Sequence, residues 1–135
     1  MLPQPLIAVD DVQGTSAWYQ AVLGFTSGHG GDEYEQLMSD GRMVMQLHSW
    51  DAHEHPHLGV QGARPYGNGV VLWFLSSEVE RAYARARDAG AEILEPIAIN
   101  PNANHLEFWL RDPNGYVVVV ASNYGELGGF ARNAA

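Results

Sequence analysis

A chain of 135 residues, 46% of them hydrophobic, is long enough for one domain or for two half-size units that share a core. Sixteen acidic and seven basic residues give a formal net charge of −9, so the basic face that nucleic-acid binding requires is not expected. The chain has no cysteine, which excludes disulfides, thiol catalysis and cysteine metal ligands. No apolar run approaches the roughly 20 residues that cross a membrane, and no signal peptide is evident. We therefore expect a cytoplasmic protein that binds neither nucleic acid nor a membrane.

The first half of the chain is predicted to contain one helix and several strands. In chain order, we expect a strand at residues 6–9, a helix from Thr15 or Ser16 to Leu23, a turn at residues 27–32, and strands at residues 34–38 and 42–49. Gly24 is placed to end the helix. The pair Asp40-Gly41 is a strong signal for a hairpin between the last two strands.

The second half repeats this order after a connector at residues 51–66, which is rich in histidine, proline and glycine. In chain order, we expect a strand at residues 70–75, a helix that begins at the capping box Ser77-Glu78-Val79-Glu80 and ends at Gly90, and strands at residues 93–99, 105–111 and 116–121. The two helix-ending glycines, Gly24 and Gly90, are 66 residues apart. Two copies of one strand–helix–strands unit favour an α+β fold with sheet-rich halves.

Two motifs of the chain carry a family resemblance. The first is Ser16-Ala17-Trp18-Tyr19 followed by Leu23-Gly24-Phe25, and the second is Leu110-Arg111-Asp112-Pro113-Asn114-Gly115-Tyr116. Together they resemble the vicinal oxygen chelate superfamily, which includes glyoxalase I, bleomycin-resistance proteins, fosfomycin-resistance enzymes and extradiol dioxygenases. The resemblance covers roughly residues 4–123.

The resemblance implies an α+β fold of two βαβββ modules with curved mixed sheets, of the glyoxalase/bleomycin-resistance type. We expect residues 1–125 to form a single domain of two tandem βαβββ units, at about residues 4–50 and 67–123, with the connector at residues 51–66 between them. Residues 126–135 are expected to form a C-terminal tail. Each single helix leaves one sheet face uncovered, so a homodimer is expected.

Family enzymes hold a divalent metal through one residue from each of four strands, usually histidine or glutamate. The matching positions of this chain are Gln4, Gln46 (or Met45, if counted from the turn), Val70 and Val119. Valine has no donor atom, and amide oxygens alone are poor ligands for transition metals. We therefore expect no metal at these positions and no cofactor, which weakens the lactoylglutathione lyase and extradiol dioxygenase interpretations.

Other residues keep an enzymatic alternative open. A displaced metal site could be built from His48, His105 and Glu107, or one of these side chains could act as a general acid or base in a lyase, isomerase or dioxygenase. The remaining clustered histidines, which we interpret as part of a solvated loop, are His53, His55 and His57.

The missing metal donors favour a metal-independent protein that binds, and sequesters, a small aromatic or cationic compound. Tryptophan faces suit planar or cationic ligands, and Glu107 adds a charge that favours a cation. Strand alternation lets Gln46 and His48 share one face, and His105, Glu107 and Trp109 another. The residues expected to line the ligand site are Gln4, Gln46, His48, Trp50, Trp73, His105, Glu107 and Trp109.

Overall fold

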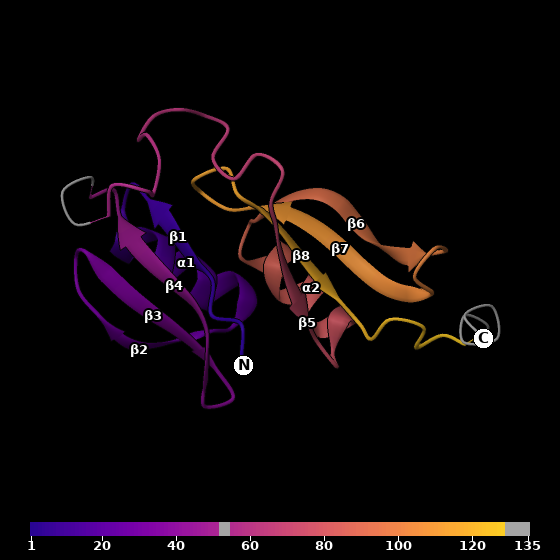
Figure 1. Ribbon diagram of the computed structural model, residues 1–135. Coiled ribbons are helices and arrows are strands. Elements are labelled where there is room, and N and C mark those ends of the chain that lie inside the picture. The colour runs from indigo at the N-terminus through magenta and orange to yellow at the C-terminus, as the bar shows by residue number, and fades with distance from the viewer. Residues whose placement is uncertain (52–54, 129–135) are drawn as a thin grey trace. The chain divides into compact units, whose positions relative to one another are not determined.

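The computed structural model describes residues 1–51 and 55–128, and the chain divides into two compact units, residues 1–66 and residues 67–135 (Figure 1). His53 and the part of the expected tail beyond residue 128 lie outside the described residues. Among the residues that the structure describes, no helix is both long enough and apolar enough to cross a membrane.

Within the described residues, each unit contains one helix and one four-stranded mixed sheet. Unit 1 consists of β1 (Leu6–Val9), α1 (Val12–Leu23), β2 (Thr26–Gly30), β3 (Tyr34–Ser39) and β4 (Arg42–Ser49), with the sheet order β1-β4-β3-β2. Unit 2 consists of β5 (Val71–Leu75), α2 (Val79–Asp88), β6 (Glu92–Asn100), β7 (His105–Arg111) and β8 (Val117–Ala121), with the sheet order β5-β8-β7-β6. The first strand of each unit pairs in parallel with the last, and the other pairs are antiparallel. The predicted α+β fold of two βαβββ modules is confirmed.

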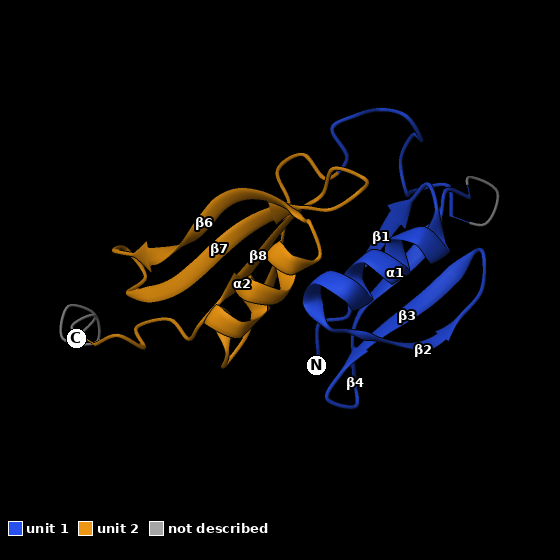
Figure 2. Ribbon diagram, turned by 180° about the vertical axis from the view of Figure 1, so that it is seen from behind, with its two compact units in different colours: residues 1–66 blue, residues 67–135 orange. Residues whose placement is uncertain are grey.

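One face of each sheet packs against the helix of its own unit (Figure 2). In unit 1, Tyr19 of α1 and the strand residues Leu37, Met45 and Leu47 have no exposed surface. In unit 2, the ring of Tyr83 on α2 meets that of Phe108, with centroids 5.1 Å apart. Because side chains alternate along a strand, the intervening residues lie on a second face that carries no helix of the same unit. We call this second face the open face.

Helix α1 begins earlier than the sequence suggests. The expected caps, Thr15 and Ser16, lie inside the helix and are buried, whereas Asp11 is the N-cap. The Asp11 carboxylate accepts a hydrogen bond from the backbone N–H of Gly14 at 3.0 Å, which satisfies one of the free donors of the first turn. The predicted stop at Gly24 is confirmed, since this residue has a φ of 75°. Residues 26–30, expected in part as a turn, form β2 because they pair with β3.

Helix α2 does not form the predicted capping box. Its N-cap is Glu78, and no side-chain hydrogen bond caps the helix there. Instead, the hydroxyl of Ser76 accepts from the backbone N–H of Glu78 at 3.0 Å. Ser76 is one residue before Ser77, the cap that the motif implies. The backbone N–H of Ala91 then closes the far end by donating to the carbonyl of Ala86, with Gly90 at a φ of 75°.

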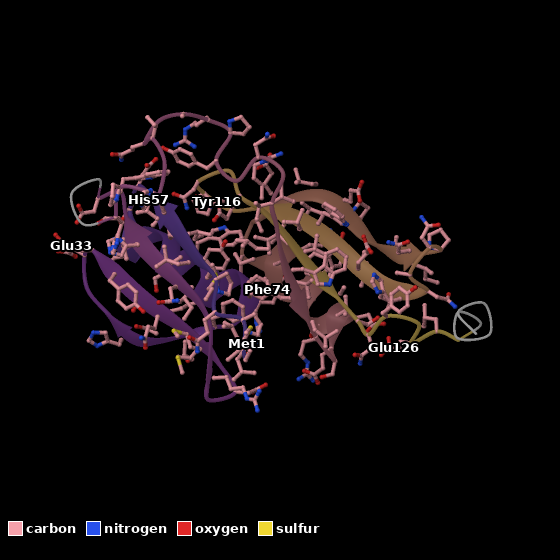
Figure 3. The ribbon with its side chains drawn as sticks, in the orientation of Figure 1. Met1, Glu33, His57, Phe74, Tyr116 and Glu126 are labelled. Atoms are coloured by element: carbon pink, nitrogen blue, oxygen red, sulfur yellow. The ribbon has the colours of Figure 1, made fainter. Side chains whose placement is uncertain are left out.

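The turn between β7 and β8 is held by a buried aspartate. The Asp112 side chain accepts from the backbone N–H groups of Asn114 and Tyr116, each at 2.9 Å. The buried ring of Tyr116, which is labelled in Figure 3, lies against Gly67 at the start of unit 2. A Cβ at Gly67 would lie 2.5 Å from this ring, and its φ is 71°, so only glycine fits here.

Candidate functional site

Three polar or aromatic side chains of β7 share the open face of unit 2. Phe108 and Leu110 have no exposed surface and lie on the helix-covered face. The alternating residues His105, Glu107 and Trp109 therefore point to the open face, as the sequence suggested.

The neighbouring strands extend this face with two further residues. Trp73 on β5 pairs with Val119 on β8, and Val119 pairs in turn with Trp109 on β7. Trp73 is 48% exposed, and its ring meets that of Trp109 edge to face, with centroids 6.3 Å apart. Val119, at the fourth family metal position, is fully buried between the two tryptophan positions. The centre of the open face is thus aromatic and apolar.

Glu107 is the polar centre of the face. Its carboxylate oxygen Oε1 accepts from Asn100 Nδ2 and from His105 Nε2, each at 2.7 Å, and Oε2 accepts from Trp109 Nε1. The side chain is nearly buried, so these donors replace the water that the carboxylate loses. Burial by itself raises the pKa of Glu107, but the hydrogen bonds from Trp109, Asn100 and His105 and the charge of His105 bring the pKa below its ordinary value. Glu107 is therefore an ionised acceptor.

His105 holds the Glu107 carboxylate through a hydrogen bond. Since an ionised carboxylate only accepts, Nε2 of His105 carries the proton in the bond to Glu107. The other ring nitrogen, Nδ1, is buried and has no hydrogen-bond partner in residues 1–51 and 55–128. The residue is 3% exposed, and its ring lies 5.9 Å from that of Trp73. His105 thus holds the carboxylate in place without presenting a nitrogen to solvent.

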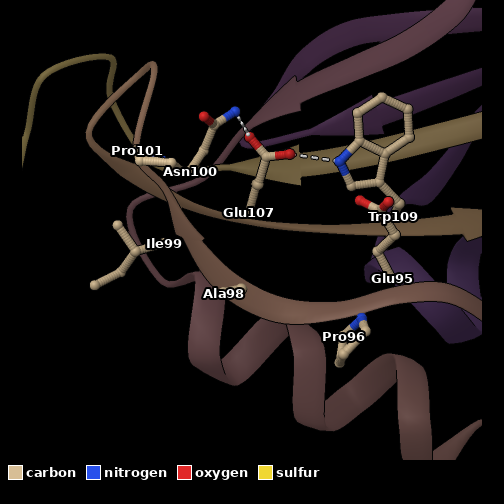
Figure 4. A pocket seen from close by; sticks show the side chains of 8 residues that line it. All are labelled: Glu95, Pro96, Ala98, Ile99, Asn100, Pro101, Glu107 and Trp109. Atoms are coloured by element: carbon tan, nitrogen blue, oxygen red, sulfur yellow. Dashed lines mark hydrogen bonds between the residues drawn. The ribbon is translucent and has the colours of Figure 1, made fainter.

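A cavity of about 230 Å³ opens beside this cluster, between β6 and β7 (Figure 4). The pairing of these strands is irregular between Ile93 and Ala98, and the strand there contains Pro96, which cannot donate to the ladder. Two carboxylates, Glu95 and Glu107, and one indole, Trp109, face the cavity. The lining residues are Glu95, Pro96, Ala98, Ile99, Asn100, Pro101, Glu107 and Trp109.

Three features of this cavity were missed by sequence reasoning, namely Glu95, Asn100 and the prolines. Asn100 ends β6 and pairs with His105 across a short turn, so its amide reaches Glu107. The signal that could have revealed it is the Asn100-Pro101-Asn102 segment, because such residues favour a tight turn and thereby place Asn100 opposite His105.

Two of the expected metal positions, Gln4 and Gln46, belong to unit 1. Met45 is fully buried on the helix-covered face, so alternation assigns the second position to Gln46. The Gln46 amide oxygen accepts from the Tyr34 hydroxyl at 2.6 Å, and its nitrogen donates to the backbone carbonyl of Gln4 at 2.9 Å. Both polar atoms of Gln46 are thus engaged, while the Gln4 side chain is exposed.

The residue expected at the third metal position, Val70, is exposed. Val70 precedes β5, whereas Val71 alternates with Trp73 and therefore belongs to the open face. The chemical conclusion is unchanged, because neither valine has a donor atom.

The other expected residues lie in unit 1. His48 on β4 is 8% exposed and contacts the ring of His55. The Trp50 ring packs on Tyr66, with centroids 5.0 Å apart, and its Nε1 is buried with no partner in the described part of the chain. Trp50 thus packs against Tyr66 at the end of the connector.

The displaced metal site considered from the sequence draws on both units. The structure brings His105 and Glu107 together in unit 2, and His48 belongs to unit 1. Within the described residues, no group of three or more histidine, aspartate or glutamate side chains is arranged to hold a metal ion.

Comparisons with known proteins agree with the fold. Residues 2–120 match the Glyoxalase/Bleomycin resistance protein/Dioxygenase superfamily. A protein of unknown function from Agrobacterium tumefaciens str. C58 is similar in structure, with a TM-score of 0.73 at 18% identity, over 91% of this chain and 94% of that one. TioX from Micromonospora sp. ML1 has a TM-score of 0.67 at 17% identity, over 91% and 99% of the two chains.

A glyoxalase/bleomycin resistance protein/dioxygenase family enzyme from Burkholderia phytofirmans PsJN has a TM-score of 0.66 at 20% identity, over 87% of this chain and 94% of that one. At these identities the likeness concerns the fold alone. A comparison with curated proteins found no match.

Proposed function

The chain belongs to the Glyoxalase/Bleomycin resistance protein/Dioxygenase superfamily, and on this premise we propose that it is a metal-independent protein that binds and sequesters a small aromatic cation. The observation that carries the proposal is the cavity beside Glu107, where one indole and two carboxylates face the same space of about 230 Å³. Ligand sites of proteins typically combine apolar or aromatic walls with a few placed polar groups. A cavity of this size accommodates one ring system of a ligand.

The charge of the residues that line the cavity favours a ligand of opposite charge. The charged residues among its lining, Glu95 and Glu107, are both acidic. Three donors already hold the Glu107 carboxylate, whereas the Glu95 side chain is exposed and makes no hydrogen bond or ion pair among the described residues. We assign the direct ion pair to Glu95 and the stacking contact to Trp109. The net charge of −9 would also raise the local concentration of a cation.

The same geometry favours binding over acid–base catalysis. A lowered pKa makes the Glu107 carboxylate a weaker base, and Trp109, Asn100 and His105 occupy three of its roughly four acceptor positions. The free nitrogen of His105 is buried, so it is not positioned to exchange a proton with a ligand. Metal independence is supported by the engaged amide of Gln46 and by the valines at the other positions.

The proposal includes a homodimer. The open face of unit 2 exposes Val71, Trp73 and Leu75, with Leu75 65% exposed. A single helix covers only one side of each sheet, so a second copy of the chain is a fitting cover for the other side.

The proposal is tested with a planar cationic dye, such as ethidium, titrated against the protein while dye fluorescence is followed. Trp109→Ala is expected to weaken binding by about 1–3 kcal/mol through loss of the stacked contact, and Glu95→Gln by about 1 kcal/mol or more through loss of the charge. The matched controls are Trp18→Phe and Glu33→Gln in unit 1, which should keep the affinity of the unaltered protein. Full affinity in both cavity variants would place the site elsewhere.

A further inference from the structure

We infer that His48 and His55 of unit 1 form a two-histidine site for a transition-metal ion, with Zn²⁺ as its simplest occupant. Nε2 of His48 and Nε2 of His55 face each other at 3.1 Å, and the two rings meet edge to face with centroids 4.4 Å apart. This pair is distinct from the family metal positions at Gln4 and Gln46. The inference does not rest on the proposed small-molecule site.

The tautomer of His48 is fixed by the backbone. Its Nδ1 lies 2.7 Å from the carbonyl oxygen of Ser49, and a carbonyl only accepts, so Nδ1 carries the proton. In the neutral ring, Nε2 then holds a lone pair that is directed at His55. Histidines that bind metals usually donate their second ring N–H to a carbonyl or carboxylate in this way, because the bond fixes the ring and raises its basicity.

The spacing of the two nitrogens suits tetrahedral coordination. Zn–N bonds of about 2.0–2.1 Å place two nitrogens roughly 3.3 Å apart, so the observed 3.1 Å has to open by only a few tenths of an ångström. In the metal-free pair, the Nε2–H of His55 donates a hydrogen bond to Nε2 of His48. A bound ion would replace this hydrogen bond, and the neutral ring of His55 would then carry its proton on Nδ1 instead.

The number of protein ligands defines the kind of site. Residues 1–51 and 55–128 supply no third histidine or acidic side chain to this pair. The two remaining positions of a tetrahedral ion would be filled by water, so the site has one protein ligand fewer than a catalytic zinc site. Imidazole donors suit zinc, copper and nickel, and the chain has no cysteine to compete for them.

The two ligands also differ in how they are held. His48 is nearly buried on β4, and the ring of Tyr34 lies 6.1 Å from it. His55 is exposed and belongs to the connector between β4 and β5. A metal ion would therefore tie the connector to the sheet. This predicts that zinc raises the thermal stability of the protein, and that above the Kd the gain grows with the logarithm of the zinc concentration.

The test is calorimetric titration of the full chain with ZnCl₂, together with thermal unfolding with and without the metal. His55→Gln is the decisive variant, because this exposed side chain can be changed without disturbing the core. His57→Gln is the matched control, since it removes another exposed histidine of the same connector (Figure 3). We expect the unaltered chain and the control to bind one zinc. His55→Gln should bind at least about 10-fold more weakly, because it loses one of two direct ligands, and loss of a second-shell partner alone typically costs about 10- to 100-fold.

A spectroscopic readout completes the design. In nitrogen-15 spectra of the imidazole rings, zinc should shift the Nε2 signal of His48 while its Nδ1 stays protonated. No zinc binding by the unaltered chain, equal affinity in His55→Gln, or equal losses in His55→Gln and His57→Gln would each overturn the assignment. None of these results bears on dye binding by the cavity of unit 2, so the two proposals fail separately.

Discussion

Glu107→Gln perturbs the cluster at the centre of the open face of unit 2. In the protein, Oε1 accepts from Asn100 and His105, and Oε2 accepts from Trp109. A glutamine of the same shape keeps one acceptor oxygen and places an NH₂ group at the other position. At least one of the three donors then faces another donor, and the bonds that remain lose the charge of the carboxylate.

The expected cost follows from these contacts. A buried donor left without a partner costs about 1–3 kcal/mol, and a hydrogen bond to a charged group contributes about 1 kcal/mol more than a neutral one. Trp109 is only half-buried, so water can satisfy part of its lost bond. We therefore expect Glu107→Gln to lower the free energy of unfolding by about 2–4 kcal/mol at neutral pH.

Urea unfolding followed by circular dichroism measures this loss. Glu95→Gln is the matched control, because it removes an exposed carboxylate of the same cavity, and it should change stability by no more than about 0.5 kcal/mol. Equal stability of Glu107→Gln and the unaltered protein at neutral pH would refute the assignment of Glu107 as an ionised acceptor.

The pH dependence of stability provides a second, independent test of the charge of Glu107. The pKa of Glu107 in the folded protein lies below its ordinary value of 4.5, so its contribution to stability is complete above that value. The contribution is lost as the pH falls from there through the lower pKa of the folded state. The difference in stability between the unaltered protein and Glu107→Gln should therefore narrow over this acidic range, and a constant difference would contradict the lowered pKa.

Four further predictions follow from other parts of the molecule. Ser16→Ala should lower the free energy of unfolding by about 1–3 kcal/mol, because the Ser16 hydroxyl donates at 2.7 Å to the buried carboxylate of Glu35, and urea unfolding measures the loss. Phe108→Ala should cost about 3–5 kcal/mol in the same assay, since Phe108 is fully buried against α2, and a loss below 1 kcal/mol would contradict this packing. Sedimentation at micromolar concentration should give twice the mass of 14.8 kDa, and a single-chain mass would exclude the dimer. Gln46→Ala should leave zinc affinity unchanged in calorimetry. A tenfold loss of affinity would instead indicate that zinc binds at the expected family position Gln46.

The order of elements and the open face of unit 2 could be predicted from the sequence because they depend on local signals. Alternation along residues 105–111 placed Glu107 and Trp109 on one face, and Gly24 marked the end of α1. Local signals misplaced the start of α1, since Thr15 and Ser16 resemble caps but are buried by packing against the sheet. A tertiary contact overrides a local preference at such positions.

The candidate site could be predicted only in part, because its chemistry depends on pairing between strands. Nothing in the spacing of Asn100 and Glu107 states that their side chains meet, since this contact follows from the register of β6 and β7. The irregular pairing near Glu95 that opens the cavity likewise depends on two strands together. His48 lies on a strand, whereas His55 lies in a connector whose sequence has no hydrophobic periodicity. No sequence pattern could therefore predict the contact between them.

The central claim is that the cavity between β6 and β7 binds a small aromatic cation. The most direct measurement is a titration of the isotope-labelled full chain with ethidium, followed by backbone amide chemical-shift changes in NMR spectra. We predict that the largest saturable changes lie at residues 95–100 and 107–109, with the indole N–H of Trp109 shifted as well. Saturable changes confined to other residues, or no saturable change at all, would contradict the claim.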